Sequence, residues 1–340
     1  MDILYLINYM LPIKKKNNNG GIDFIKLILA IGVILLHVIP NTDYTFWIGN
    51  GICRLAVPFF FFVSGFYSYN FFEQKKIGFI RFSRFLSPYI ISFFVWFCVY
   101  LYFVYTKIIV GISFTNIFVY LSKILYVLFY KEGYFHLWYV LATIYAFIFF
   151  FILKKRNIKE YRISILAIFL FLLGVFSTTY SCLIKPLTPI FPIVRFIGYP
   201  LTFAFPMIYL GYFIHKKKFS LYPYLKSKFL LVVLLVLFCV EFSFVWFYIT
   251  GNKFFDMFFL QPFVIPTLFF YAQDLHINDS RGLQVSGEIY FLHPLIIYLV
   301  LQLGVISDSI LLEIISVILC TYIIAFLIHP YLYKFYRIVK

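Results

Sequence analysis

Charged residues are scarce in this chain of 340 residues, of which 12% are Asp, Glu, Lys or Arg and 64% are apolar. A soluble globular domain carries about 25% charged residues, so this chain lacks the polar coat that water requires. Its mean hydropathy is +0.95. This composition excludes an ordinary soluble enzyme and predicts an integral membrane protein with nearly all of its mass in the bilayer.

Cysteine is also scarce, and long polar segments are absent. The five cysteines are scattered and lack the spacing of metal ligands, so we expect apolar packing and no metal site. The net charge of +16 comes from short basic clusters between apolar runs. That placement is typical of loops beside a membrane and argues against nucleic acid as a partner.

Apolar runs follow one another along the whole chain, and a bilayer crossing needs about 20 such residues. They predict an all-α transmembrane helix bundle of about ten spans. The runs are Gly21–Pro40, Ile52–Phe72, Phe85–Tyr105, Tyr134–Leu153, Ile163–Tyr180, Phe196–Ile214, Phe229–Thr250, Phe254–Tyr271, Ile289–Gly304 and Ser309–Tyr331. The segment Ile108–Tyr130 is apolar but interrupted by polar residues, so we predict an interfacial helix on the outer surface.

The basic residues predict the orientation of these spans. With the N-terminus inside, 21 Lys and Arg face the cytoplasm and seven face outward, so both termini are expected in the cytoplasm. An additional span at Ile108–Tyr130 would move the clusters at Lys154 and Lys216 outside. We therefore divide the chain into a cytoplasmic tail (1–20), a transmembrane domain (21–331) and a second cytoplasmic tail (332–340).

The first predicted span carries Lys26 and His37, and ionisable groups within a span are costly enough to be candidates for function. Eleven residues separate them, which places both on one helix face about 16 Å apart. Asp23 lies one turn before Lys26 and is predicted to pair with it. The alternative is a snorkelling lysine and a histidine bonded to a neighbouring helix.

Two arginine features precede the next spans. Arg54 lies at the outer entrance of the second span, where Ser64 and Gly65 permit close helix contact further along. Arg81 and Arg84 lie one turn apart before the third span, a geometry suited to phosphate. The alternative for this pair is an ordinary basic anchor on the cytoplasmic side.

Further candidates lie in later spans. His136 and Trp138 form a polar, aromatic entrance at the outer start of the fourth span, and His293 lies about one and a half turns into the ninth span from the cytoplasm. Glu241 lies mid-span in the seventh, at a depth near that of His37. We predict that it orients His37, with a tyrosine or Arg195 as the alternative partner.

Together these motifs resemble the acyltransferase-3 family of bacterial integral membrane acyltransferases, over the whole chain. The motifs are Lys26 with His37, Arg81 with Arg84, Arg54–Gly65, His136–Tyr139 and Ile289–Pro294. The short form is similar to the polysaccharide O-acetyltransferases and to the membrane domain of serine racemases. It lacks the Trp-Ser-Leu…Glu pattern of longer members, so the family points to no acidic partner for His37.

The resemblance implies an enzyme of the bacterial cytoplasmic membrane that moves an acyl group, usually acetyl, from cytoplasmic acyl-CoA to envelope sugars. It implies catalytic roles for His37 and Lys26 and binding of acyl-CoA by Arg81 and Arg84. Acyl-CoA is then a donor substrate and not a permanently bound cofactor. The acceptor is an envelope glycan or lipid-linked sugar.

The other candidates complete this expected site. Glu241 is expected to assist His37 in catalysis. Four residues are expected to line the acceptor side or the channel, and they are Arg54, His136, Trp138 and His293.

A transporter of a serine-like amino acid or a glycan precursor is the main alternative. Its support is the proline-rich stretch from Pro186 to Pro206, because transporters favour broken helices. Against it, the sequence shows no inverted repeat. An assembly subunit is the third possibility, and it would leave Lys26, His37 and the arginine pair unexplained.

Overall fold

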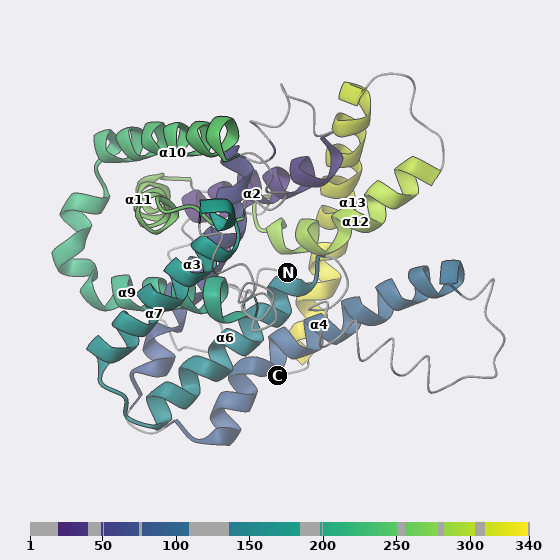
Figure 1. The fold of residues 1–340 in the computed structure, drawn as a ribbon. Coiled ribbons are helices and arrows are strands. Elements are labelled where there is room, and N and C mark those ends of the chain that lie inside the picture. Colours follow the sequence, from purple (N-terminus) through teal and green to yellow (C-terminus); the bar gives the residue numbers. More distant parts are fainter. Residues whose placement is uncertain are drawn as a thin grey trace.

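A computed structural model describes residues 20–39, 49, 51–74, 77–108, 136–183, 198, 200–249, 256–277, 282–302 and 310–338. These residues form helices joined by turns, with no β-strand among them (Figure 1). The predicted all-α bundle is therefore confirmed. Apart from its first residue, the segment predicted as an interfacial helix, Ile108–Tyr130, lies outside the described residues.

The helices follow the predicted apolar runs. They are α2 (Gly20–Val38), η2 (Ile52–Leu55), α3 (Ala56–Phe72), α4 (Phe79–Ile108), α6 (Trp138–Lys155), α7 (Glu160–Ser177), η5 (Pro200–Ala204), α9 (Phe205–Leu225), α10 (Lys228–Tyr248), α11 (Gln261–Asp274), α12 (Ser286–Gln302) and α13 (Ile310–Ile338). The element η2 is a short 3₁₀ turn that leads into α3, and η5 is a short π-helical turn that leads into α9.

Seven helices of the described chain are long and apolar enough to cross a bilayer. The helices at three predicted spans, α9, α11 and α12, are not both long enough and apolar enough to be among these seven. Helix α9 continues through the basic cluster Lys216–Lys218, which makes it more polar. Helix α11 begins only at Gln261, because Pro262 favours a helix start and the Gln261 side chain accepts a hydrogen bond from the Phe258 N–H.

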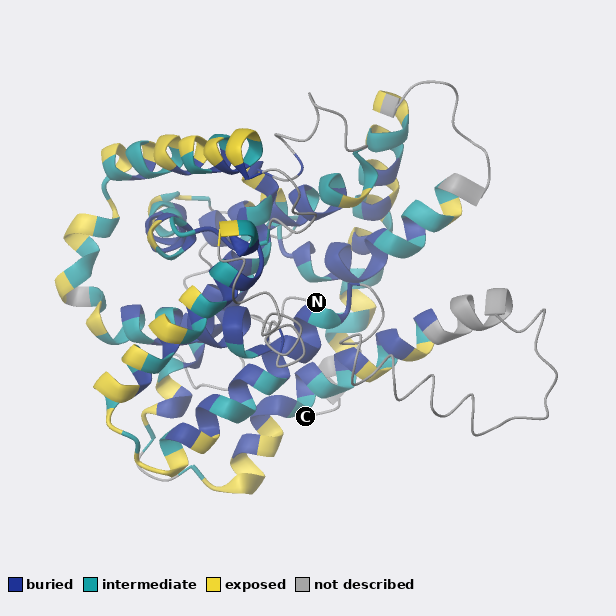
Figure 2. Cartoon of the chain, viewed as in Figure 1, coloured by how far each residue is buried: buried dark blue, intermediate teal, exposed yellow. Residues whose placement is uncertain are grey.

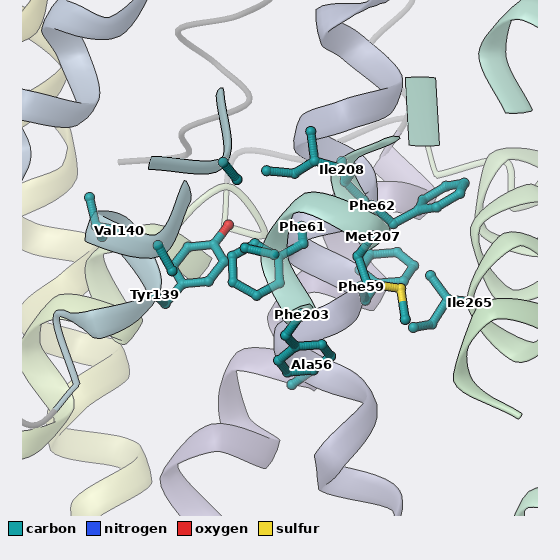
Figure 3. Close-up of a cluster of buried hydrophobic side chains, with 14 of the residues drawn as sticks. Ala56, Phe59, Phe61, Phe62, Tyr139, Val140, Phe203, Met207, Ile208 and Ile265 are labelled. Carbon is teal, nitrogen blue, oxygen red and sulfur yellow. The ribbon is translucent and has the colours of Figure 1, made fainter. Parts of the chain in front are cut away.

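Helices α3 and α9 cross with their backbones in direct contact. A Cβ atom at Gly65 would collide with the Ile208 carbonyl, and one at Gly211 with the Phe62 carbonyl. Small residues permit such approach between membrane helices, which confirms the close contact predicted for Ser64 and Gly65. Phe61 extends this core toward Tyr139 of α6, with ring centroids 4.7 Å apart (Figure 3).

The outer faces of several helices are apolar and exposed. In α10 the exposed side chains include Val232, Val236, Val240 and Phe244, which recur every four residues along one face. Figure 2 shows this exposed face of α10 turned away from the bundle. A face of this kind would be unfavourable in water and suits lipid, so the chain is a multi-pass membrane protein.

Loops predicted on the cytoplasmic side meet at one end of the bundle. Lys154 Nζ lies 2.8 Å from Glu73 Oε1, and Tyr212 donates a hydrogen bond to the same carboxylate. Lys216 Nζ lies 2.5 Å from Glu160 Oε2. These pairs join the ends of α3 and α6 to the middle of α9, and α9 to the start of α7, in agreement with the predicted common side of their loops.

Candidate active site

Helix α2 holds Lys26 and His37, the two groups singled out in the first span. Lys26 is buried, with its ammonium nitrogen 2.7 Å from Asp23 Oδ1, so the predicted pairing of these residues is confirmed. Gln284, just before α12, donates a hydrogen bond of 3.2 Å to the other oxygen of Asp23. This ion pair therefore fixes the start of α2 against the segment that leads into α12.

Three histidines meet at the other end of α2, and we call them the histidine cluster: His37 of α2, His136 of the turn before α6, and His293 of α12. The rings of His37 and His293 stack with centroids 5.3 Å apart and an interplanar angle of 24°. His136 meets His293 edge-on at 5.7 Å. His136 and His293 are buried, whereas His37 is exposed. His37 is therefore the ring that a substrate can reach.

The position of His293 corrects one prediction. From its depth of about one and a half turns into the ninth span, we expected it toward the cytoplasmic side of the membrane. The structure instead places it between the rings of His37 and His136. The reason is that α12 begins inside the protein, where Ser286 and Glu288 are already buried, so its depth cannot be counted from a surface loop.

Tyrosines surround the histidine cluster, and sequence reasoning missed them. The Tyr100 ring lies 4.4 Å from that of His136, and its hydroxyl donates a hydrogen bond of 2.6 Å to the Phe291 carbonyl. Tyr290 donates to the His136 carbonyl. Among 30 tyrosines, Tyr139 and Tyr290 lay within recognised motifs, whereas spacing offered no signal for Tyr100.

The hydrogen bonds of His293 determine which of its nitrogens carries the proton. Nδ1 lies 3.1 Å from the Ile289 carbonyl oxygen, which can only accept, so Nδ1 is the donor. In the neutral ring Nε2 then holds the lone pair. Nε2 is buried and has no hydrogen-bond partner within the described residues. His293 therefore presents an unsatisfied acceptor inside the cluster.

Arg54 lies near His37 because η2 packs against α2, and its charge acts on the His37 ring. Its guanidinium forms an ion pair with Asp256, and Gln261 donates hydrogen bonds of 3.2 Å to the carbonyls of Arg54 and Asp256. The expected entrance residue is thus a fixed cation beside the reactive end of α2. Trp138, expected at the same entrance, starts α6 and packs edge-on against Phe61.

Glu241 does not pair with His37 as we predicted. Its carboxylate accepts hydrogen bonds of 2.6 Å from the Tyr180 hydroxyl, 2.7 Å from the Phe259 N–H and 3.0 Å from the Leu260 N–H. The tyrosine alternative is therefore correct. These donors occupy Glu241 because the backbone N–H groups before α11 need acceptors at a helix start.

Arg81 and Arg84 are exposed at the start of α4. Arg81 bonds to Gln74, and neither arginine forms an ion pair within the described residues. Neither one bonds to Lys26 or His37, so the structure does not bring the pair directly to the histidine cluster. The same helix nevertheless reaches that cluster at Tyr100, about 24 Å further along its axis.

Comparison with known protein families gives one decisive match. The family model for acyltransferase-3, described as an acyltransferase domain, matches residues 19–330. The chain belongs to the acyltransferase-3 family. It is therefore a membrane acyltransferase, and the expectation drawn from its motifs is confirmed at the level of the family. Neither the curated proteins nor the solved structures gave a match.

Within this acyltransferase, the matched region contains the Lys26–Asp23 pair, the histidine cluster, Arg54 and the arginine pair of α4. The histidine rings stack face to face or edge to face and do not converge on a point. Among the described residues, no group of three or more His, Cys, Asp or Glu is arranged to hold a metal ion. Neighbouring imidazole rings of this kind are suited to acid–base or nucleophilic chemistry.

Proposed function

We propose that this acyltransferase moves an acyl group, with acetyl as the default, from cytoplasmic acyl-CoA to a hydroxyl of a cell-envelope or surface polysaccharide. The observation that carries the proposal is the exposed ring of His37 at the edge of an otherwise buried histidine cluster. An imidazole titrates near neutral pH and serves as nucleophile or general base. The bacterial cytoplasmic membrane is the proposed location.

The donor site in this proposal is the arginine pair of α4. Arg81 and Arg84 are exposed and form no ion pair within the described residues, so their guanidinium groups are available to phosphate. Helix α4 then runs about 24 Å to Tyr100, beside His136. That length is of the order of an extended pantetheine arm, which would carry the thioester from the arginines to the histidines.

Lys26 has a positioning role in this proposal. Its buried ion pair with Asp23, which is also bonded to Gln284, ties α2 to the segment before α12. Because His37 and His293 lie on these same two elements, the tie fixes how their rings meet. Arg54, held by Asp256, supplies the positive charge near His37 where charge develops on the acyl carbonyl.

The test is transfer of radiolabel from acetyl-CoA to envelope glycan in membrane vesicles that contain the protein. The wild type should label the glycan, and His37→Ala should not, with equal amounts of protein in the membrane. His276→Ala is the matched control, because His276 is exposed near the end of α11 and, among the described residues, bonds to the Asp274 backbone alone. Serine uptake without any acyl transfer would instead establish a transporter.

A further inference from the structure

The buried Nε2 atom of His293, a hydrogen-bond acceptor, lowers the stability of the fold in a way that a phenylalanine at this position would not. A buried polar atom without a partner lowers stability, and the Nε2 atom of His293 is such an atom within the described residues. Its Nδ1 is already satisfied by the Ile289 carbonyl. Packing against His37 does not require a nitrogen, so Nε2 is explained by a group that arrives during the reaction.

We propose that His293 is the base that takes the proton from the acceptor hydroxyl, while His37 carries the acyl group. The inference rests on the proposed function and assigns its two half-reactions to two neighbouring rings. An acylated His37 has no free lone pair on the nitrogen that holds the acyl group. A second base within ring contact is then needed, and His293 stacks on His37 at 5.3 Å.

In the first half-reaction, a His37 nitrogen attacks the thioester carbonyl. The carbon–sulfur bond breaks, and CoA leaves as the thiolate while His37 becomes a cationic acyl-imidazole. Arg54 lies on η2, which packs against α2, and its positive charge would stabilise the oxyanion that forms on the way. No proton leaves His293 in this step, so the step does not need that ring.

In the second half-reaction, the hydroxyl oxygen of the acceptor attacks the acyl carbon, and its proton passes to His293 Nε2. The carbon–nitrogen bond breaks, which releases the ester and a neutral His37. Protonated His293 then returns its proton to the CoA thiolate, and the cycle closes. The acceptor must enter between α2 and α12 to reach Nε2, because that atom is buried.

The test separates the half-reactions in full-length protein reconstituted in lipid, with radiolabelled acetyl-CoA as donor and vesicle envelope glycan as acceptor. His293→Phe keeps an aromatic ring beside His37 but has no base. We expect it to release one CoA per polypeptide, to accumulate acetyl on the protein, and to transfer acetyl to glycan at least 100-fold more slowly. Hydroxylamine, a strong nucleophile that needs little base assistance, should restore release of the acetyl group.

Two results would overturn the inference. One is glycan transfer by His293→Phe within threefold of the wild type, and the other is loss of CoA release together with transfer. His293→Gln is the second variant, because its amide can still donate to the Ile289 carbonyl while its oxygen accepts hydrogen bonds without taking protons. If His293→Phe fails to fold, His293→Gln decides by the same readouts. A wild type that neither releases CoA nor labels glycan would instead refute the proposed function itself.

Discussion

Two polar groups inside the bundle of this acyltransferase, the half-buried Glu241 and the buried His293, differ in how their hydrogen bonds are satisfied. Both lie on apolar helices, and both were candidates for the active site. Glu241 accepts three hydrogen bonds, from Tyr180 and from two backbone N–H groups before α11. His293 satisfies Nδ1 within its own helix and leaves Nε2 unpaired among the described residues.

The difference teaches that burial alone does not distinguish structural from catalytic groups in a membrane protein. The Glu241 carboxylate connects three segments of the chain through its three hydrogen bonds, so these bonds stabilise the fold. An imidazole with an unused lone pair beside an exposed histidine has capacity left for substrate. We therefore expect variants of Glu241 to lose stability and variants of the histidine cluster to lose activity.

The largest effect is expected for His37→Ala. Acyl transfer should fall by about 10³-fold or more, because His37 is the accessible ring of the cluster and acid–base or nucleophilic groups contribute on this scale. The free energy of unfolding should change by no more than about 0.5 kcal/mol, since the ring is exposed. The measurements are initial rates with acetyl-CoA and unfolding of the detergent-solubilised protein. A large loss of stability would show that His37, like Glu241, has a structural role.

The reverse pattern is expected for Glu241→Ala. Three donors lose their acceptor, so the free energy of unfolding should fall by about 2–3 kcal/mol. The rate per folded molecule should stay within about threefold. Tyr180→Phe is the matched control, because it removes one of the three hydrogen bonds and should cost about 1 kcal/mol. If Glu241→Ala transferred acyl groups as slowly as His37→Ala, Glu241 would also be needed for activity, and its role would not be structural alone.

The sequence predicted features that depend on neighbouring residues better than contacts between segments that lie far apart in the chain. Apolar runs predicted the helices, because a helix buried in lipid needs a certain length and an apolar composition. Both are properties of one continuous segment of sequence. The Asp23–Lys26 pair was predicted because residues one helical turn apart are neighbours. The family followed from several short motifs taken together.

Contacts between distant segments were predicted less well. Depth in the bilayer, counted from the ends of apolar runs, paired Glu241 with His37 and separated His293 from it. Both errors arise because α11 and α12 begin inside the bundle, where Gln261 and Ser286 are buried. No local pattern records where a helix starts relative to its neighbours. The roles of the catalytic residues therefore stay predictions until they are measured.

Two arginines show the same difference between a polar group that has a partner and one that has none in the described part of the chain. Arg54 is paired with Asp256, whereas Arg84 forms no ion pair within the described residues. If Arg84 binds a CoA phosphate, Arg84→Ala should raise the KM for acetyl-CoA about tenfold, which corresponds to about 1.4 kcal/mol. The KM for an acetyl thioester of pantetheine without phosphates should not change.

Arg156→Ala is the matched control for Arg84→Ala. Arg156 is exposed just after α6, and α6 packs against α4. Removal of its charge should leave the KM for acetyl-CoA within about twofold. An equal rise in both variants would show a general effect of positive charge and not a phosphate site at the start of α4.

The smallest effect on stability is expected at Glu73, whose carboxylate has hydrogen-bond partners but is exposed to solvent. Burial raises the pKa of this carboxyl, but hydrogen bonds from Lys154 and Tyr212 outweigh it, and the pKa is lowered overall. A lowered pKa in the folded state stabilises the protein above the pKa of the unfolded chain, about 4.3 for Glu, and the stabilisation is lost as pH falls through the folded value.

Glu73→Gln should therefore lower the free energy of unfolding by roughly 0.5 kcal/mol near neutral pH, since solvent screens the exposed pair. The difference from the wild type should stay constant between about pH 8 and 6 and shrink below about pH 4. Unfolding of both proteins across this range measures it. A difference that grows as the pH falls would contradict the assigned charge state, because the carboxylate would then be least stabilising where it is ionised.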